Sequence, residues 1–307
     1  MTSKNQRAKP FLKWAGGKSQ LLSQFEAHYP PELKQGKIKR YIEPFLGGGA
    51  VFFDLAQTYD FGSVFLYDVN PELVLVYQVV KHYPDDLMAA LEQLENKYHG
   101  LTHSERKDFY FLIREQYNTQ RLDFNYEKYS PDSTVRASWL IFLNRTCFNG
   151  LFRINSKGEF NVPPGKYKHP KILDADNLRV ASEVLQKAEI IGGDFQSCES
   201  VMTDDSFIYF DPPYRPLSQT AKFTAYAQSE FAEREQERLG QFFRKLDRLY
   251  DVKMMLSNSD PKNEDPTDDF FERLYEGFTI ERVSANRMIN SKGKKRGLVQ
   301  EIVVKNY

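Results

Sequence analysis

In Arg40-Tyr-Ile-Glu-Pro-Phe-Leu-Gly-Gly-Gly49, a strand pattern over 40–43 runs into a turn that ends in three consecutive glycines. A helical pattern follows over 50–56, and a second apolar run over 63–67 ends at Asp68. A strand, a glycine turn, a helix, a strand and a terminal acid form the first half of a dinucleotide-type α/β fold. The sequence therefore predicts an α/β chain built on a Rossmann-like sheet.

Helix and strand patterns along the rest of the chain predict one domain interrupted by another. Helical spacing of apolar residues covers 19–29, 73–83, 86–98, 105–117 and 135–144. Strand patterns cover 188–191, 207–210, 252–256, 278–288 and 298–306. The last two strands predict a hairpin, and the polar, acidic stretch 260–269 predicts a mobile loop. Because helices dominate over 72–187, we expect an inserted, mostly helical domain there, with 1–71 and 188–307 forming the other domain.

The composition bounds the class of protein. The 307 residues include 42 basic and 42 acidic side chains, so any nucleic-acid surface must come from local segregation of charge. The two cysteines, Cys147 and Cys198, lack metal-ligand spacing, which argues for a reducing compartment and against a zinc site. The first residues lack the apolar core of a signal peptide, and no apolar run reaches membrane-spanning length. We therefore expect a soluble cytoplasmic protein with no metal site and no membrane contact.

The tetrapeptide Asp211-Pro-Pro-Tyr214 directly follows the apolar run 206–210, so a strand ends in a rigid turn. An exocyclic amine of adenine or cytosine is a poor nucleophile until acceptors hold both of its hydrogens. The Asp211 carboxylate supplies one acceptor, and Pro213 favours extended geometry at Pro212, whose carbonyl supplies the other. Tyr214 offers a flat face for a base turned out of its stack. The pattern indicates methylation of a nucleobase amine; the alternative is an ordinary proline-rich turn.

The glycine turn and the acids around it indicate the kind of cofactor. Gly47, Gly48 and Gly49 permit close backbone approach to a bound nucleoside, and Asp68 follows at a spacing where an acid binds ribose hydroxyls. The dinucleotide fingerprint G-x-G-x-x-G is incomplete, because its third glycine position is not a glycine here. The charge of Glu43 would also repel a pyrophosphate. A cationic ligand without phosphate suits these acids better, which favours S-adenosylmethionine over a nicotinamide cofactor. The alternative for Glu43 is a solvated or capping carboxylate.

One segment of this neutral chain is strongly basic. Its positive residues are Arg145, Arg153, Lys157, Lys166, Lys168 and Lys171, against the single acid Glu159. Apolar and polar residues alternate over 151–163 about an Asn-Ser-Lys-Gly turn, which predicts a hairpin with Arg153 near its base. A two-stranded ribbon fits the major groove of DNA, where Arg favours guanine. The alternative is a solvated hairpin, and the second basic stretch 287–296 predicts either phosphate contacts or a solvated turn.

Five motifs of the chain occur in the order that is typical of one protein family. They are FLKWAGGK (11–18), YIEPFLGGG (41–49), LNRTCFNGLFR (143–153), GEFNVPPGKY (158–167) and DPPY (211–214). Over nearly its whole length the chain resembles the DNA adenine methyltransferase family of the Dam and DpnII type, the alpha group of amino-methyltransferases (D12 class). The resemblance implies a Rossmann-like class I methyltransferase sheet with an inserted, mostly helical target-recognition domain.

The resemblance, together with the acids near the glycine turn, assigns roles to individual positions. The expected cofactor-binding residues are Trp14, Lys18, Glu43, Phe45, Gly47, Gly49, Asp68, Asp194, Phe195 and Asp211. The expected catalytic residues are Asp211, Pro212 and Tyr214. The residues expected to recognise target bases are Lys13, Asn149, Leu151, Arg153, Pro163 and Tyr167. Two departures, Pro164 in place of an aromatic residue and a long loop over 120–134, bear on the recognition sequence rather than on the chemistry.

By this resemblance the chain transfers a methyl group from S-adenosylmethionine to N6 of a flipped adenine in duplex DNA, within GATC or a related GAT-containing site. We expect a monomer in solution that binds double-stranded DNA, with a cognate restriction endonuclease as a further candidate partner. Two other classes stay open: a methyltransferase for another planar amide or amine, such as a protein glutamine or an RNA adenine, and a catalytically idle DNA-binding protein. A nicotinamide dehydrogenase is a more distant alternative, because of the missing glycine and Glu43.

Overall fold

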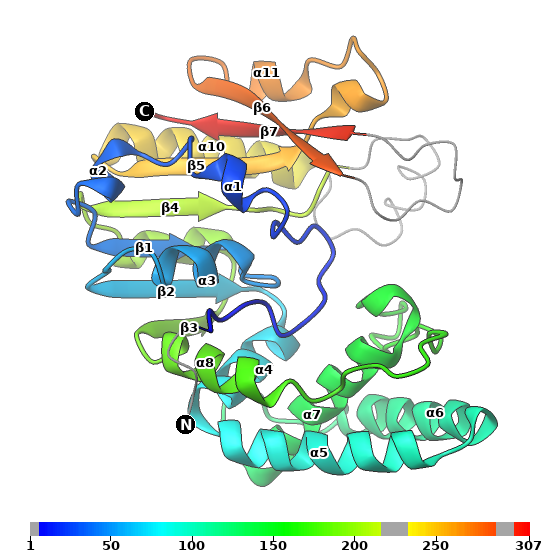
Figure 1. Cartoon of the computed structure of the whole chain (residues 1–307). Helices are drawn as coiled ribbons and strands as arrows, with labels where there is room; N and C mark the ends of the chain where they lie inside the picture. The colour runs from blue at the N-terminus through cyan, green and yellow to red at the C-terminus, as the bar shows by residue number, and fades with distance from the viewer. Residues whose placement is uncertain (1–5, 216–232, 287–297) are drawn as a thin grey trace. The chain divides into compact units, whose positions relative to one another are not determined.

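A computed structural model describes residues 6–215, 233–286 and 298–307 and shows a mixed α/β chain. Its sheet has seven strands in the order β3-β2-β1-β4-β5-β7-β6 (Figure 1). The strands are β1 Arg40–Glu43, β2 Ser63–Asp68, β3 Ala188–Gly192, β4 Ser206–Phe210, β5 Lys253–Ser259, β6 Thr279–Asn286 and β7 Leu298–Lys305. β1 pairs in parallel with β2 and β4, β4 pairs in parallel with β5, and β7 runs antiparallel to β5 and β6. The predicted α/β fold with a Rossmann-like sheet is confirmed.

The central strands form where apolar runs predict them, because both faces of these strands are buried. Tyr41, Ile42 and Glu43 of β1 are buried, as are all five residues of β4. Parallel strands covered on both faces require such continuous apolar runs. The predicted C-terminal hairpin is also confirmed by the antiparallel pairing of β6 with β7, although the connection between them lies outside the described residues.

The chain divides into two compact units. The first comprises Met1–Gly17, Gly47–Gln57 and Asp68–Gly192, and the second comprises Lys18–Leu46, Thr58–Tyr67 and Gly193–Tyr307. The first unit therefore contains the glycine turn and Asp68 as well as the helical segment 72–187. None of the helices in the described parts of the chain is both long and apolar enough to cross a membrane.

Helices make up most of the first unit. They are α3 Ala50–Ala56, α4 Pro71–His82, α5 Pro84–Gly100, α6 His103–Gln120, α7 Pro131–Thr146, the short 3₁₀ helix η1 Phe148–Gly150, and α8 Ala175–Leu185. Caps fix where two of them begin. The Asn70 side chain accepts a hydrogen bond from Glu72 N at the start of α4, and Thr102 forms a reciprocal capping box with Glu105 at the start of α6. The sequence analysis missed α8.

A buried ion pair ties α4 to α7 inside the first unit. The Arg136 side chain of α7 is fully buried, and its Nε donates to Glu72 Oε2 of α4 at 3.0 Å. Its Nη2 bonds Glu72 Oε1, and its Nη1 donates to the Tyr117 carbonyl of α6 at 2.9 Å. A charge without water is tolerated only when such partners are in place, so these contacts fix how the three helices pack.

The helices of the second unit flank the strands that it contributes. They are α1 Leu22–Phe25, α2 Pro31–Lys34, the 3₁₀ helices η2 Phe195–Val201 and η3 Pro261–Asn263, α10 Glu233–Leu249, and α11 Phe270–Leu274. The helix predicted over 19–29 is shortened to the single turn of α1, after which Ala27 N and His28 N bond to carbonyls three residues earlier, as in tighter turns. The sequence analysis missed α10, although its buried residues Leu239, Phe242 and Leu246 lie at helical spacing.

The stretch 260–269 is tied to the second unit rather than mobile as predicted. Asp260 is buried, and its Oδ2 accepts a hydrogen bond from Arg282 Nε of β6 at 2.7 Å. Its Oδ1 accepts from Lys262 N at 3.1 Å, and Asp268 Oδ2 accepts from Arg215 Nη1 at 2.7 Å. The acids that suggested a solvated loop therefore serve as hydrogen-bond acceptors within the fold.

Candidate functional site

Asp211 follows the last residue of β4 and carries a partly exposed carboxylate. β4 lies between β1 and β5, so its end is supported on both sides. The Asp211 side chain keeps 21% of its surface exposed, and its Oδ1 lies 2.7 Å from Lys18 Nζ. Ser257 Oγ of β5 donates to the same oxygen at 3.4 Å. The strand end therefore holds this carboxylate against a cation and a hydroxyl.

Lys18, which the sequence assigned to cofactor binding, is also the ion-pair partner of Asp211. Only 2% of its side chain is exposed, and Nζ donates to Tyr214 Oη at 2.9 Å. The same ammonium lies 4.7 Å from the centroid of the Tyr214 ring. Burial acts to lower the pKa of Lys18, but the carboxylates of Asp211 and Glu301 outweigh it and raise the pKa above its usual value. Lys18 is therefore a permanent cation beside the predicted catalytic motif.

Glu301 joins this cluster although it was not predicted from the sequence. It lies on β7, opposite Ser259 of β5 and Val283 of β6. Its Oε1 accepts a hydrogen bond from Tyr214 Oη at 2.7 Å, and its Oε2 lies 3.5 Å from Lys18 Nζ. An acid within the apolar run of a strand was the available signal, because a buried carboxylate needs a partner.

Burial raises the pKa of Asp211 from 3.8 to about 6. Lys18 opposes this rise, whereas the nearby Glu301 carboxylate adds to it. Ser257 also lowers the pKa through its hydrogen bond and is itself bonded to Tyr209 Oη at 2.7 Å. Asp211 is therefore a carboxylate at neutral pH and can accept hydrogen bonds from a ligand.

The turn after Asp211 is held by α10. Pro212 is buried, and the Pro213 carbonyl accepts a hydrogen bond from Gln236 Nε2 at 2.8 Å. Gln236 is itself fully buried, and its Oε1 accepts from Asn258 Nδ2 at 3.3 Å. One turn, held in place by the hydrogen bond from Gln236, therefore carries the three catalytic candidates Asp211, Pro212 and Tyr214.

Glu43, at the end of β1, is a buried acid with a defined partner. Glu43 is only 2% exposed, and its Oε2 accepts a hydrogen bond from Tyr41 Oη at 2.6 Å. The alternative of a solvated carboxylate is therefore wrong. Burial, followed by the Glu43 charge, raises the pKa of Tyr41 well above its ordinary value, so Tyr41 is a hydrogen-bond donor here.

Phe45, Asp194 and Phe195 form a second group of predicted cofactor residues in the second unit. The rings of Phe45 and Phe195 stack with centroids 5.4 Å apart and planes 27° apart. Arg238 of α10 lies over the Phe195 ring at 4.2 Å and donates to both oxygens of Asp194, at 2.9 and 2.6 Å. These hydrogen bonds lower the pKa of Asp194, so its carboxylate is held in its charged form.

The glycine turn and Asp68 form a compact group in the first unit. Gly47 and Gly49 both have left-handed backbones, with φ of 48° and 67°. Gly47 N donates to Asp68 Oδ2 at 3.0 Å, and Asn70 N donates to Oδ1 at 2.9 Å. A Cβ on Gly47 would lie 3.0 Å from Trp14 Cδ1, so the indole packs against the bare turn. The predicted cofactor residues Trp14, Gly47, Gly49 and Asp68 are therefore brought together.

Lys13 is clamped to the segment that follows α7. Its N donates to Asn144 Oδ1 and its carbonyl accepts from Asn144 Nδ2, both at 2.8 Å. The same Nδ2 donates to the Gly150 carbonyl at 2.9 Å, and a Cβ on Gly150 would collide with the Lys13 side chain at 2.3 Å. Lys13 Nζ lies 4.5 Å from the centroid of the Tyr167 ring. Lys13 therefore contacts both Tyr167 and Gly150, and the residue before Gly150, Asn149, has a left-handed φ of 56°.

The segment 151–163 forms the predicted hairpin turn, with only a short antiparallel pairing, in which Asn161 N donates to the Arg153 carbonyl at 3.1 Å. Ile154 pairs with Phe160 in an isolated antiparallel bridge, and Gly158 N closes the turn onto the Asn155 carbonyl at 2.9 Å. The Asn155 side chain stabilises this turn, because its Oδ1 accepts hydrogen bonds from Lys157 N at 2.9 Å and from Glu159 N at 3.0 Å. Arg153 lies beside the bridge, where its Nε donates to Asn161 Oδ1 at 2.7 Å.

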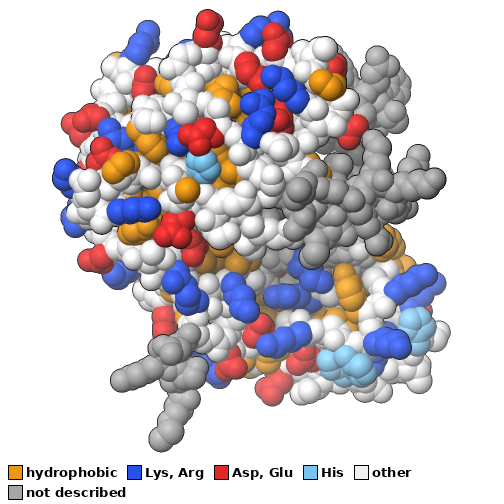
Figure 2. Space-filling view, turned by 45° about the horizontal axis from the view of Figure 1, so that its top comes forward, with side chains coloured by type: hydrophobic (Ala, Val, Ile, Leu, Met, Phe, Trp, Pro, Cys, Tyr) orange, Lys and Arg blue, Asp and Glu red, His pale blue; other side chains and the backbone are white. Residues whose placement is uncertain are grey.

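The remaining recognition candidates lie at the two ends of this segment. Leu151 is 37% exposed, and the carbonyl of the exposed Pro163 accepts a hydrogen bond from Phe148 N at 2.8 Å. Figure 2 shows Lys and Arg side chains on the surface of this helical part of the molecule, with acidic side chains between them. The second basic stretch, 287–296, lies outside the described residues.

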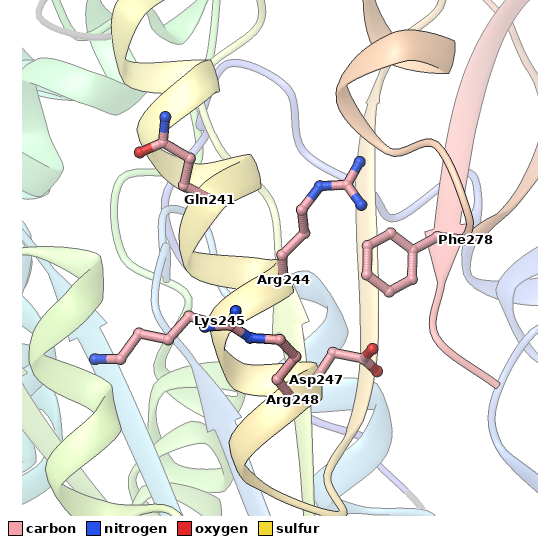
Figure 3. A pocket seen from close by; sticks show the side chains of 6 residues that line it. All are labelled: Gln241, Arg244, Lys245, Asp247, Arg248 and Phe278. Atoms are coloured by element: carbon pink, nitrogen blue, oxygen red, sulfur yellow. The ribbon is translucent and has the colours of Figure 1, made fainter.

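A separate basic pocket lies along α10 and is lined by none of the predicted site residues (Figure 3). It is lined by Gln241, Arg244, Lys245, Asp247, Arg248 and Phe278. Arg244 already donates to the carbonyls of Glu276 and Leu274, both at 2.8 Å, and Lys245 pairs with Glu199 at 2.6 Å. These bonds give Arg244 and Lys245 structural roles.

Comparison with known proteins identifies the family. Residues 14–289 match the model of the D12 class N6 adenine-specific DNA methyltransferases. The chain is 49% identical to the type II methyltransferase M.MjaIII of Methanocaldococcus jannaschii, over 97% of this chain and 99% of the relative. It is 38% identical to the type II methyltransferase M1.LlaDCHI of Lactococcus lactis subsp. cremoris, over 97% and 95%. It is 35% identical to DNA adenine methylase of Vibrio cholerae, over 98% and 96%. The sheet, the braced Asp-Pro-Pro-Tyr turn and these matches agree, and the chain belongs to the D12 class of N6 adenine-specific DNA methyltransferases.

Proposed function

We propose that this adenine-specific DNA methyltransferase transfers a methyl group from S-adenosylmethionine to N6 of an adenine flipped out of duplex DNA. The observation that carries the proposal is the Asp211 carboxylate, which stands at the end of β4 with 21% of its side chain exposed. An acceptor at this position, next to a carbonyl and an aromatic ring, suits the amino group of a planar base. Extrusion of the base is required because N6 cannot be reached inside the duplex.

The residues proposed to bind the cofactor are Trp14, Lys18, Glu43, Phe45, Gly47, Gly49, Asp68, Asp194, Phe195 and Asp211. The donors suit a cation with a ribose: in the second unit Glu43 supplies a buried carboxylate and Asp211 a partly exposed one, and in the first unit Asp68 offers oxygens beside the bare glycine turn. When bound, S-adenosylmethionine supplies a methyl group on a sulfonium, which is already an activated leaving group. Within the second unit, the half-buried ring of Phe45, backed by the buried ring of Phe195, provides an apolar surface that suits a nucleobase.

The proposed catalytic residues act on the amine of the adenine. Asp211 accepts one N6 hydrogen and the Pro212 carbonyl accepts the other, so the nitrogen lone pair is released from the ring. Tyr214 stacks on the base, and its hydroxyl is fixed by Lys18 and Glu301 at 2.9 and 2.7 Å. As the N6–carbon bond forms and the carbon–sulfur bond breaks with its electron pair on sulfur, positive charge grows on N6 and is stabilised by Asp211. The extra proton on N6 then leaves to solvent.

We further propose that residues 72–187 form the domain that recognises the target sequence. The recognition residues are Lys13, Asn149, Leu151, Arg153, Pro163 and Tyr167. The clamp of Asn144 on Lys13 and Gly150 supports a joint role for Lys13 and Asn149, since it fixes both backbones in one arrangement. The proposed target is GATC or a related GAT-containing site.

The cellular setting follows from this substrate. Two of the relatives are type II methyltransferases, which supports a cognate restriction endonuclease as a genetic partner. A monomer is proposed to act on each site, and the enzyme is placed in the cytoplasm, where cellular DNA lies.

Competition between acceptors tests the proposed function. The purified chain is incubated with labelled S-adenosylmethionine and with duplex DNA, RNA or protein acceptors. We expect label only on duplex DNA, on N6 of adenine, with one sequence context in a map of methylated adenines. Thermal stabilisation by S-adenosylmethionine in the absence of DNA provides a second readout of cofactor binding. Label on RNA or protein instead, or no stabilisation by the cofactor, would contradict the proposal.

A further inference from the structure

We propose that Glu301 is a positioning residue for methyl transfer: it holds the Lys18 ammonium and the Tyr214 hydroxyl, and thereby leaves the Asp211 carboxylate available to the adenine amine. The inference rests on the proposed roles of Asp211 and Tyr214. It assigns a function to β7, whose other role is to join β5 and β6 in the sheet.

The geometry places Glu301 at the centre of the cluster. Its Oε1 accepts from Tyr214 Oη at 2.7 Å, and its Oε2 lies 3.5 Å from Lys18 Nζ. Lys18 Nζ in turn lies 2.7 Å from Asp211 Oδ1 and donates to Tyr214 Oη at 2.9 Å. Every member of the cluster is in the second unit, and β7 is held on both sides by β5 and β6. Glu301 is therefore a rigid anchor rather than a mobile surface acid.

The carboxylate of Glu301 changes the net charge of the cluster. Asp211 and Lys18 alone would form a neutral pair, and a paired carboxylate is a weak acceptor for an amine. With the second carboxylate of Glu301, the cluster carries one formal negative charge in excess. That excess attracts a sulfonium and stabilises the positive charge that grows on N6, because charges in a site with little water are poorly screened.

The second carboxylate oxygen of Glu301, Oε2, is placed to accept a hydrogen bond from Lys18. Among the residues that the structure describes, Glu301 Oε2 is buried and has no hydrogen-bond partner. It lies 3.5 Å from Lys18 Nζ, so a small movement of the ammonium gives it a hydrogen bond. When Asp211 turns to the adenine amine, Lys18 then passes from Asp211 to Glu301 and stays neutralised.

Tyr214 is the second group that Glu301 positions. Tyr214 is 36% exposed, so packing alone constrains its ring weakly. The hydrogen bond to Glu301 and the Lys18 ammonium 4.7 Å from the ring centroid fix the orientation of the ring. A stacking platform that is already oriented loses less conformational freedom when a base binds.

The pH dependence of the reaction separates this role from simple packing. The groups that face Asp211 are Lys18, Glu301, Tyr214, Tyr209 and Ser257. Burial comes first in raising the pKa of Asp211 to about 6; Lys18 opposes that rise, and Glu301 contributes to it. Replacement of Glu301 by a neutral residue therefore lowers the pKa of Asp211. The acid limb of the rate profile should move to lower pH even though the rate itself falls.

The experiment compares Glu301→Gln with the wild-type chain and with Glu281→Gln as a matched control. Glu281 lies on β6, is 41% exposed at its side chain, and pairs with Lys305 at 2.7 Å outside the cluster. We expect Glu301→Gln to lower kcat roughly tenfold to a hundredfold, the loss typical of a hydrogen bond to a charged group. The KM for DNA should change little, and the acid limb of kcat should shift to lower pH. Glu281→Gln should match the wild type in kcat, in the KM for DNA and in the position of the acid limb.

Two results would overturn the proposal: a wild-type kcat in Glu301→Gln, or a reduced kcat with the acid limb unmoved. If Glu301→Gln does not fold, Glu301→Asp keeps the charge but shortens the reach. That variant should keep the wild-type acid limb while kcat falls, and an unchanged kcat would contradict the positioning role. Asp211→Asn is measured in parallel, because substantial activity there would refute the proposed function itself rather than the role of Glu301.

Discussion

Lys18 Nζ lies 2.7 Å from Asp211 Oδ1, so the last residue of the motif FLKWAGGK pairs with the first residue of the motif DPPY. Lys18 and Asp211 are far apart in the chain, but both belong to the second compact unit. Their contact means that the proposed catalytic carboxylate is charged, buried on one side and already partnered before a base arrives. The pairing controls both how strongly Asp211 accepts hydrogen bonds and at what pH it does so.

Replacement of Asp211 by alanine should abolish methyl transfer while DNA binding is largely kept. The variant loses the acceptor for the N6 hydrogen and the charge that stabilises the transition state, a loss of at least about a hundredfold in kcat. Transfer of labelled methyl groups and a gel-shift titration measure the two properties separately. Near-normal transfer by Asp211→Ala would refute the assignment of Asp211.

Methyl transfer should fall as the pH drops below about 6, because burial raises the pKa of Asp211 to about 6 and the protonated carboxyl is a poor acceptor for its N6 hydrogen. Above about pH 6 the rate should no longer rise with pH as a result of Asp211 deprotonation. The sign for stability is opposite: the folded chain binds this proton more tightly than the unfolded chain, so this group stabilises the fold as pH falls from about 6 toward 4. A kcat/KM profile, with circular dichroism as the control for folding, checks the prediction; an acid limb below about pH 5 would contradict it.

Replacement of Arg136 by alanine should destabilise the chain by about 3–5 kcal/mol, because Glu72 is left charged and buried without its partner. The matched control is Arg179→Ala, since that side chain is 50% exposed and its contact with Asp176 is 3.9 Å long. The control should change stability by less than about 0.5 kcal/mol. Urea unfolding of both variants measures the difference, and equal stabilities would show that the buried pair is not needed.

Replacement of Gly47 by alanine should weaken the binding of S-adenosylmethionine roughly tenfold. The added Cβ meets Trp14 Cδ1 at 3.0 Å and also strains a backbone with φ of +48°. Gly36→Ala is the control, because Gly36 has φ of +68° but open space where its Cβ would stand. Both variants should lose about 1 kcal/mol of stability, whereas only Gly47→Ala should lose affinity in calorimetric titration. Equal affinities would separate the glycine turn from cofactor binding.

Replacement of Arg153 by alanine should weaken discrimination at one base position by about 1–3 kcal/mol, as expected for a side chain that recognises a base edge. Lys157→Ala in the same turn is the control, since Lys157 is exposed and lies at the tip. Rates on duplexes with single base changes measure the preference. If Arg153→Ala keeps the wild-type preference, this turn does not recognise the base.

Local patterns allowed much of the fold to be predicted. β1 and α3 have the predicted bounds, because a continuous apolar run and a glycine turn act on near neighbours in the chain. The four long helices of the first unit were also predicted, to within a few residues at each end. The hairpin turn over 151–163 was predicted as well, but the alternation of residue types did not reveal how short its antiparallel pairing is.

The sequence by itself determined the chemical groups of the site: Asp211 at a strand end, two prolines, an aromatic ring and a glycine turn, each set by adjacent residues. Tertiary structure alone decided which charges meet. Glu301 reaches Tyr214 and Lys18 because of the antiparallel register of β7 against β5, and Lys18 reaches Asp211 from a distant part of the chain. Such contacts depend on strand order and register, and a shift of one residue would turn Glu301 to the other face of the sheet.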